Sequence, residues 1–397
     1  MFDVMVVGVG AMGSAALWEL SRRGVKAAGV EQFDVPHPWG SSHGQSRLIR
    51  MAYYEHAHYV PLLKRAYERW RMVEREEGVR VLEITGGLYM GRGGGSGSAL
   101  VEGSIASARA HGLAHERLSG AEIQRRWGVF RGLAAAGMEG VYEADAGFLR
   151  PEAAVAAFAT GAMKRGAEIR ARERVVGWKR AGGGYRVRTD RGEYAAGKIV
   201  VTAGAWSAGL LEGLRGKLAV TRQVMGWVWP KEPERFAIGA FPSWCMEVEE
   251  GGLVYGPPLA GLGGGRDGNW EGGPVGLKVA HHVAGERCAA ETVDRTERPG
   301  DWTVIRRVLR EHLPAADGPA MGMKVCLYTN SPDHHFVVDQ AADGVVFAAG
   351  FSGHGFKFAS VMGEALADLA IGGKTALPVE FLRAGRQGMA PGVDSGP

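Results

Sequence analysis

The amino-terminal segment constrains the fold of this chain more than any other part of the sequence. Residues 2–7 form a nearly continuous apolar run, and Gly8-Val9-Gly10-Ala11-Met12-Gly13 follows it directly. A buried strand, a G-x-G-x-x-G turn and a helix form the start of a dinucleotide-binding βαβ unit. We therefore predict a strand over 2–7, a helix over about 15–23 and a second strand over 25–30.

Each glycine of the turn has its own physical role. Gly8 permits the tight turn, Gly10 lets the backbone approach a pyrophosphate, and Gly13 lets the helix pack against the strand. The free N–H groups at the start of the helix, near Ala11 and Met12, favour the negative charge of the pyrophosphate. These five positions are the first part of a predicted cofactor site.

An acidic residue closes the second predicted strand. Glu31 lies 18 residues after Gly13, where a carboxylate accepts hydrogen bonds from the adenosine ribose hydroxyls, and Gln32 beside it belongs to the same site. A glycine-rich chain can contain such a turn by chance, but here the strand, the helix and the acid all agree. The fingerprint does not by itself separate FAD from NAD.

Composition excludes several classes of protein. The 397 residues are 46% apolar and 23% charged, which suffices for two or three domains with a large core. The net charge of +4 and the absence of a Lys/Arg run argue against a nucleic-acid surface, and no apolar stretch approaches the ~20 residues of a membrane span. Three sparse cysteines fit a reducing compartment. We therefore expect a cytoplasmic protein that binds neither nucleic acid nor membrane.

Histidine pairs raise the question of a metal. His281-His282 and His334-His335 lack carboxylate or cysteine partners at ligand spacing, so we predict no metal site.

Periodicity along the rest of the chain predicts a mixed α/β protein, α+β overall. Short aromatic strands alternate with turns from 221 to 279, which is typical of an antiparallel sheet. Buried-type strands are predicted at 81–90, 198–202 and 345–349. Helical spacing is predicted for 56–75, 99–111, 120–127, 151–165, 302–312 and 359–372.

Four further segments resemble one known family. They read GSSHGQSRLIR at 40–50, GLK at 276–278, KVCLYT at 324–329 and GFSGHGFK at 350–357. In this order they are similar to signatures of the monomeric sarcosine oxidase and N-methyltryptophan oxidase family, FAD-dependent amine oxidoreductases of the D-amino-acid oxidase superfamily. The resemblance extends from residue 1 to about 385, although Gln45 stands where the family has an acid.

The resemblance implies two discontinuous domains. A Rossmann-like FAD-binding domain would comprise 1–84, 148–218 and 324–384, and a substrate domain with a mainly antiparallel sheet and helices would comprise 85–147 and 219–323. Residues 385–397, rich in Gly and Pro, are expected to form a loose tail. The glycine-rich stretch 257–275 is longer than usual in the family, which suggests a substrate bulkier than sarcosine; an unrelated surface loop is the alternative.

The same resemblance completes the expected FAD site. Arg47 and His43 match positions near the flavin ring, where Arg47 would stabilise negative charge on the reduced ring, although a structural ion pair explains Arg47 equally well. The other matched cofactor positions are Ser42, Ser46, Leu48, Val175, Ala203, Gly204, Trp206, Gly350, Ser352, Gly353, His354, Gly355, Phe356 and Lys357.

Cys326 matches the position that attaches the flavin 8-methyl carbon through a thioether. Most free cysteines are buried structural residues, which is how Cys245 and Cys288 are interpreted. Leu327-Tyr328-Thr329 beside Cys326 favours covalent attachment.

Arg50 and Lys357 match the pair that holds the substrate carboxylate. An Arg fork and a Lys point charge suit a carboxylate. Such cations are usually solvated, but here both have apolar neighbours, Leu48-Ile49 and Phe356 with Phe358. The sequence therefore favours a partly buried anion site.

Four more positions are assigned by resemblance. Lys278 matches a lysine that faces the flavin opposite the substrate and would promote reaction with O2; a surface lysine on an edge strand is the alternative. Tyr255, Tyr328 and His282 match polar positions of the substrate cavity, although lone Tyr and His residues are more often satisfied core residues.

Together these residues predict a flavin-dependent amine oxidase that acts as a monomer. It would convert a sarcosine-like N-methyl amino acid to an imine, reduce O2 to H2O2 and release formaldehyde after hydrolysis. The alternatives are a dehydrogenase with another electron acceptor, an oxidase of a cyclic imino acid such as pipecolate or proline, and a non-catalytic flavin- or nucleotide-binding protein. A non-catalytic flavin- or nucleotide-binding protein would not require Arg50, Lys357 and Lys278, because binding a cofactor needs none of them.

Overall fold

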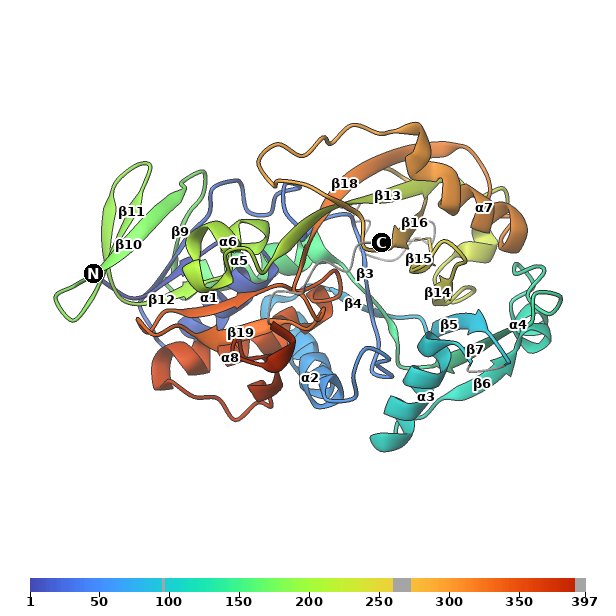
Figure 1. Cartoon of the computed structure of the whole chain (residues 1–397), viewed down its shortest axis with the longest axis horizontal. Helices are drawn as coiled ribbons and strands as arrows, with labels where there is room; N and C mark the ends of the chain where they lie inside the picture. Colours follow the sequence, from blue (N-terminus) through green and yellow to red (C-terminus); the bar gives the residue numbers. More distant parts are fainter. Residues whose placement is uncertain (95–96, 260–272, 390–397) are drawn as a thin grey trace.

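The computed structural model describes residues 1–94, 97–259 and 273–389. Two large sheets lie at opposite ends of the molecule and a small third sheet lies near its middle (Figure 1). Helices of the amino- and carboxyl-terminal regions gather around the first large sheet. The predicted α/β class, with a Rossmann-like part and a second, mainly antiparallel part, is confirmed.

The first large sheet is the dinucleotide-binding sheet. Its central strands β12, β1, β2 and β9 run parallel, and β20 joins β12 in parallel. A parallel sheet is normally covered on both faces, which explains the continuous apolar runs in these strands. The strands are β1 (Phe2–Val7), β2 (Ala27–Val30), β9 (Glu168–Arg170), β10 (Val175–Ala181), β11 (Gly184–Thr189), β12 (Glu193–Val201), β19 (Val337–Gln340) and β20 (Val346–Ala349).

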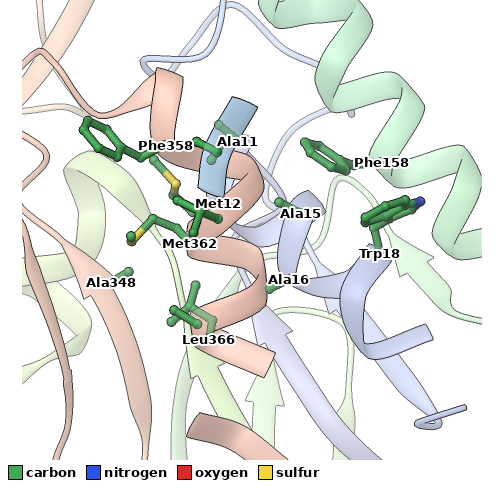
Figure 2. Close-up of a cluster of buried hydrophobic side chains, with 14 of the residues drawn as sticks. Ala11, Met12, Ala15, Ala16, Trp18, Phe158, Ala348, Phe358, Met362 and Leu366 are labelled. Atoms are coloured by element: carbon green, nitrogen blue, oxygen red, sulfur yellow. The ribbon is translucent and has the colours of Figure 1, made fainter. Parts of the chain in front are cut away.

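Helix α1 packs between two other helices on this sheet. It spans Ala11–Arg22 and so begins four residues earlier than predicted, directly after Gly10. Its alanines face α8 (Ala359–Gly372), and Trp18 packs on Phe158 of α5 (Pro151–Lys164), as Figure 2 shows. A Cβ at Gly363 would lie 2.6 Å from the backbone of Ala15. Small residues thus let α1 and α8 approach closely and fix the turn that precedes α1.

The second large sheet forms the other half of the molecule. It is antiparallel except for the pair β14–β5. Its longest strands, β13 and β18, run side by side across the top of Figure 1. The strands are β5 (Gly87–Arg92), β6 (Glu116–Ser119), β7 (Met138–Glu143), β13 (Ala219–Val228), β14 (Ser243–Glu247), β15 (Leu253–Gly256), β16 (Leu277–His282), β17 (Glu286–Arg287) and β18 (Ala320–Asn330).

The chain passes between the two halves through a three-stranded sheet, β3 (Arg47–Ile49), β8 (Gly147–Leu149) and β4 (Leu82–Ile84). The strand β3 carries part of the 40–50 segment, so this sheet holds predicted site residues at the junction. The remaining helices are α2 (Tyr59–Glu77), α3 (Ala99–Ala110), α4 (Gly120–Arg126), α6 (Ser207–Leu210) and α7 (Thr303–His312).

Two predicted boundaries can be placed on elements of the structure, and the domain division itself stays a prediction. The boundary at 324 falls inside β18, which pairs with β13, so 324–330 lie in the second large sheet. In the first residues of the expected tail, Arg386 forms an ion pair with Asp333 at 2.7 Å and Met389 is buried. The rest of that tail, and 260–272 of the glycine-rich stretch, lie outside the described residues.

Candidate active site

One cavity has lining residues from the turn after β1 as well as from strands of the second large sheet. Of the predicted site residues, Gly13, His43, Ser46 and Lys278 are the ones that do not line it. The predicted residues that line it are Gly8, Gly10, Ala11, Met12, Glu31, Gln32, Ser42, Arg47, Leu48, Arg50, Val175, Ala203, Gly204, Trp206, Tyr255, His282, Cys326, Tyr328, Gly350, Ser352, Gly353, His354, Gly355, Phe356 and Lys357.

The three glycines of the G-x-G-x-x-G turn, at one end of the cavity, are each required for a different steric reason. Gly8 has a φ of 89°, and a Cβ there would lie 2.7 Å from the Thr202 carbonyl oxygen. A Cβ at Gly13 would lie 1.8 Å from the Gly8 carbonyl oxygen, so this glycine serves packing and not the cavity. At Gly10 the nearest atom to a Cβ is Ser42 Oγ at 3.6 Å. Only Gly10 therefore keeps cavity space free, as the fingerprint predicts.

Glu31 stands at the cavity wall, but backbone groups already hold its carboxylate. Oε2 accepts a hydrogen bond from Val9 N at 2.8 Å, and Oε1 accepts one from Phe33 N at 3.1 Å. Burial raises the pKa of Glu31, and these backbone donors act in the opposite direction. The carboxylate is thus fixed in one orientation, with acceptor capacity left toward the cavity.

Cys326 lines the cavity beside a partly buried cation, Arg47. Its sulfur is 3.7 Å from Arg47 Nη2. Arg47 also donates to the carbonyl oxygens of Ser41 at 2.9 Å and Ser46 at 2.8 Å, which fixes the guanidinium. An adjacent cation stabilises negative charge on sulfur. Arg47 therefore contacts the Cys326 thiol, the Met225 thioether at 3.7 Å and backbone carbonyl groups, and these contacts differ from a structural ion pair.

Arg50 and Lys357 both reach the cavity and both are 6% exposed. Arg50 Nη2 donates to both carboxylate oxygens of Glu55, at 2.7 and 2.8 Å. Lys357 Nζ donates to the His354 carbonyl oxygen at 2.7 Å. Burial lowers the pKa of Lys357 to about 7, with Glu55 opposing and Arg50 adding to the shift. The two cations thus lie in one buried region that favours the binding of an anion, and the Glu55 carboxylate occupies part of this region.

Lys278 is buried behind the cavity wall. It lies on β16, is 3% exposed, and donates to the carbonyl oxygens of Gly44 and Ser46, at 2.8 Å each. Burial lowers its pKa well below the usual value, and nearby Arg47 adds to the shift. The surface alternative for Lys278 is therefore excluded. His43, also buried, has both ring nitrogens without a hydrogen-bond partner among the described residues.

One part of the cavity, here called the chamber, is lined by Arg50, Lys357, Tyr255, His282, Cys326 and Tyr328. His282 and Tyr328 form one polar wall of this chamber. His282 Nδ1 lies 2.8 Å from the Tyr328 hydroxyl. Burial lowers the pKa of His282 to about 3, with Glu55 opposing the shift and Lys357 and Arg50 adding to it, so the ring is neutral at ordinary pH. Tyr255 lines the same chamber from β15, opposite Cys245 of β14 in the strand register. The structure thus unites all three polar positions predicted for the substrate cavity.

Several cavity residues were missed by the sequence analysis. Cys245 was interpreted as structural, yet it lines the cavity, and strand alternation from Tyr255 through the β14–β15 pair could have identified it. Further lining residues carry no motif, among them Tyr54, Glu55, Met225, Leu253 and Glu291.

The described residues contain no helix long and apolar enough to cross a membrane. In the same parts of the chain, no group of three or more His, Cys, Asp or Glu side chains could hold a metal ion.

A dinucleotide turn that opens into a chamber with buried cations under an antiparallel sheet defines a two-part flavin oxidoreductase. The family model described as "FAD dependent oxidoreductase" (DAO) matches residues 3–369, and the chain belongs to this family. It is 39% identical to a monomeric sarcosine oxidase from Streptomyces avermitilis, over 98% of this chain and 99% of that one.

Two further comparisons are informative. An N-methyl-L-tryptophan oxidase from Escherichia coli is 32% identical over 93% of this chain and 95% of that protein. The solved structure of NikD, described as an unusual amino acid oxidase essential for nikkomycin biosynthesis, superposes with a TM-score of 0.82 at 25% identity, covering 96% and 97% of the two chains.

The residues of the cavity fit FAD. The first turn of α1 carries no acidic residue, and Gly10 leaves room for a pyrophosphate at that helix end. Glu31 keeps acceptor capacity for ribose hydroxyls. Thr329 Oγ1 is buried at the cavity without a hydrogen-bond partner among the described residues, as expected of a group that awaits a polar ligand.

Proposed function

We propose that the chain is an FAD-dependent amine oxidase whose substrate is an N-methyl amino acid. The observation that carries this proposal is the pair of buried cations, Arg50 and Lys357, at the same chamber as Cys326 and Tyr328. A buried cation is costly unless an anion compensates it. Relatives named monomeric sarcosine oxidase and N-methyl-L-tryptophan oxidase support a carboxylate-bearing secondary amine as the compensating ligand.

Substrate binding would begin when the carboxylate of the substrate displaces the Glu55 carboxylate from Arg50. Glu55 is only partly buried and holds Arg50 through two hydrogen bonds. A substrate carboxylate can replace Glu55 and meet Lys357 at the same time, because both cations line one chamber. Anchoring the carboxylate fixes the methyl-bearing nitrogen relative to the cofactor, and such positioning supplies a large part of the rate gain.

The neutral polar wall suits an amine that reacts in its neutral form. His282 is uncharged and Tyr328 keeps its proton, since burial raises the pKa of that phenol well above its usual value. Neither group forms a strong ion pair that would hold the amine as an ammonium ion. Bound FAD would supply a two-electron acceptor: a hydride would leave the amine carbon, a proton would leave the amine nitrogen, and the two electrons with two protons would reduce O2 to H2O2.

Water then hydrolyses the imine product, which gives formaldehyde when the oxidised group is N-methyl. The buried Lys278 supports O2 as the electron acceptor, because its amine, when protonated, places a positive charge beside the cavity wall, and positive charge favours oxygen reduction. The position of Cys326 beside Arg47 supports a covalent thioether to the flavin. We further propose a cytoplasmic monomer.

A panel of amines tests this function. The purified holoenzyme is assayed in air for H2O2 with sarcosine, N-methyltryptophan, pipecolate and proline, and in parallel with an artificial electron acceptor. We expect peroxide and formaldehyde from an N-methyl amino acid. Peroxide from pipecolate or proline alone would favour the cyclic imino acid oxidase. Turnover only with the artificial acceptor would favour the dehydrogenase, and no turnover with any amine would reject the proposal.

A further inference from the structure

Tyr53 contacts both cations of the chamber although it does not line the cavity. Its ring is fully buried. The Arg50 guanidinium carbon lies 4.8 Å from the ring centroid, and Lys357 Nζ lies 5.1 Å from it. The face of an aromatic ring is negative and attracts cations within about 6 Å. One ring therefore stabilises two like charges that otherwise repel each other.

The Tyr53 hydroxyl extends this contact into a hydrogen-bonded chain. It lies 2.5 Å from His354 Nδ1 and 3.5 Å from Lys357 Nζ, and His354 Nε2 lies 2.9 Å from the His334 carbonyl oxygen.

The donor and acceptor roles in this hydrogen-bonded chain follow from the group at its end, the His334 carbonyl oxygen. A carbonyl oxygen only accepts, so His354 Nε2 carries the proton. Burial lowers the pKa of His354 well below its usual value, which keeps the ring neutral and leaves Nδ1 as an acceptor. Tyr53 therefore donates to His354, and its oxygen is free to accept from the Lys357 ammonium. The chain orients that ammonium as a donor.

Tyr53 is itself held rigidly. Ser107 Oγ donates to its backbone oxygen at 2.7 Å. Its ring packs edge-on against Phe358 at 5.5 Å and Tyr59 at 5.2 Å, measured between centroids. Phe358 follows Lys357 in the chain, and the Lys357 carbonyl accepts from Trp70 Nε1 at 2.9 Å. Tyr53 thus ties the loop that carries Arg50 to the segment that carries Lys357.

We propose that Tyr53 is a positioning residue for substrate binding: its ring sets the spacing of Arg50 and Lys357, and its hydroxyl, held by His354, accepts from Lys357 and orients it. The inference rests on the proposed function, because it takes these two cations as the carboxylate site. Tyr53 acts through them and does not touch the substrate. The ligand class that it serves is a monocarboxylate that bridges both cations.

The test measures binding of a non-oxidisable carboxylate to holoenzyme variants. Methoxyacetate replaces the amine of sarcosine by an ether oxygen and is titrated by the perturbation of the flavin absorbance. For Tyr53→Phe, which keeps the ring, we expect affinity to fall about 3- to 10-fold, as for one lost hydrogen bond. For Tyr53→Leu, which loses ring and hydroxyl, we expect a fall of about 10- to 100-fold.

Tyr59→Phe is the matched control. Tyr59 is an equally buried tyrosine of the same cluster, but its hydroxyl contacts Phe336 N and His335 Nδ1, at 3.2 Å each, and not Lys357. We expect it to lower Tm about as much as Tyr53→Phe while methoxyacetate affinity stays at the wild-type value. Anaerobic titration with sarcosine should show the same affinity losses in the Tyr53 variants.

The outcomes separate this inference from the proposed function. Wild-type methoxyacetate affinity in Tyr53→Phe overturns the role of the hydroxyl. Affinity losses that follow Tm in all three variants, Tyr59→Phe included, overturn the positioning role and leave a structural one. If Tyr53→Leu does not fold, the comparison of the two Phe variants still decides. A wild-type enzyme that neither binds methoxyacetate nor oxidises any N-methyl amino acid refutes the proposed function itself.

Discussion

Arg50 Nη2 lies 2.7 and 2.8 Å from the two carboxylate oxygens of Glu55, inside the chamber where a substrate carboxylate is expected. A ligand must therefore compete with a carboxylate of the protein itself. We expect Glu55→Gln to bind methoxyacetate more tightly, by about 3- to 10-fold, because a competing charge is removed while length is kept. Titration with methoxyacetate, followed by the absorbance of the flavin, measures the affinity in the variant and in the wild type. Weaker binding in the variant would show that Glu55 supports the site instead.

Removal of the guanidinium should have the opposite effect. In Arg50→Met, a buried charged hydrogen-bonding group is lost, and we expect carboxylate binding to weaken by about 2–4 kcal/mol. Glu55→Gln is a suitable comparison, because it breaks the same ion pair from the other side. Unchanged methoxyacetate affinity in Arg50→Met would refute its role.

The protonation of Lys357 predicts how binding depends on pH. Its pKa is lowered to about 7 by burial, so the ammonium is present below pH 7 and is lost as pH rises through this value. The charged groups that face it are Glu55 and Arg50; the Cys245 thiol also faces it but stays neutral, because burial raises the pKa of Cys245 to about 12. Arg50 stays charged throughout, so we expect methoxyacetate affinity to fall above pH 7 without vanishing. In Lys357→Met this pH dependence should disappear; its persistence would assign the titration to another group.

Covalent attachment through Cys326 is tested by acid precipitation. The yellow colour should stay with the precipitated wild-type protein and move to the supernatant in Cys326→Ser. Cys288→Ser is the control, since Cys288 does not line the cavity. Colour released from the wild type would contradict the thioether.

Lys278 predicts a separation of the two half-reactions. In Lys278→Met, flavin reduction by the amine under anaerobic conditions should persist, which serves as the internal control. Reoxidation by O2 should fall by several powers of ten, each worth about 1.4 kcal/mol of lost stabilisation. Stopped-flow reoxidation at the wild-type rate would exclude the role and favour the dehydrogenase alternative.

The sequence predicted much of the fold because many of its elements are determined by interactions between residues that are close in the chain. The apolar run of β1, the steric demands at Gly8 and Gly13 and the periodicity of α8 all act within a few residues. The cavity residues with family motifs, such as Cys326 and Lys357, were also found.

Other features depend on contacts that no local pattern encodes. Arg50 and Glu55 meet in a loop without periodicity, and a buried tyrosine such as Tyr53 has no signature that distinguishes it from a core residue. The predicted boundary at 324 lies inside β18, because the pairing of β18 with β13 leaves no mark in the local sequence. The order of the tail up to Met389 depends on packing against distant strands, which its Gly/Pro-rich composition conceals.

The central claim is that this chain oxidises the N-methyl group of an amino acid with bound FAD. Its most direct test is the absorbance of the oxidised flavin band in an anaerobic cuvette after addition of sarcosine or a larger N-methyl amino acid, followed by a formaldehyde assay. We expect the band to bleach and about one formaldehyde to appear per flavin, because a two-electron cofactor turns over once without oxygen. A band that stays unchanged with every N-methyl amino acid, or bleaching without formaldehyde, would contradict it.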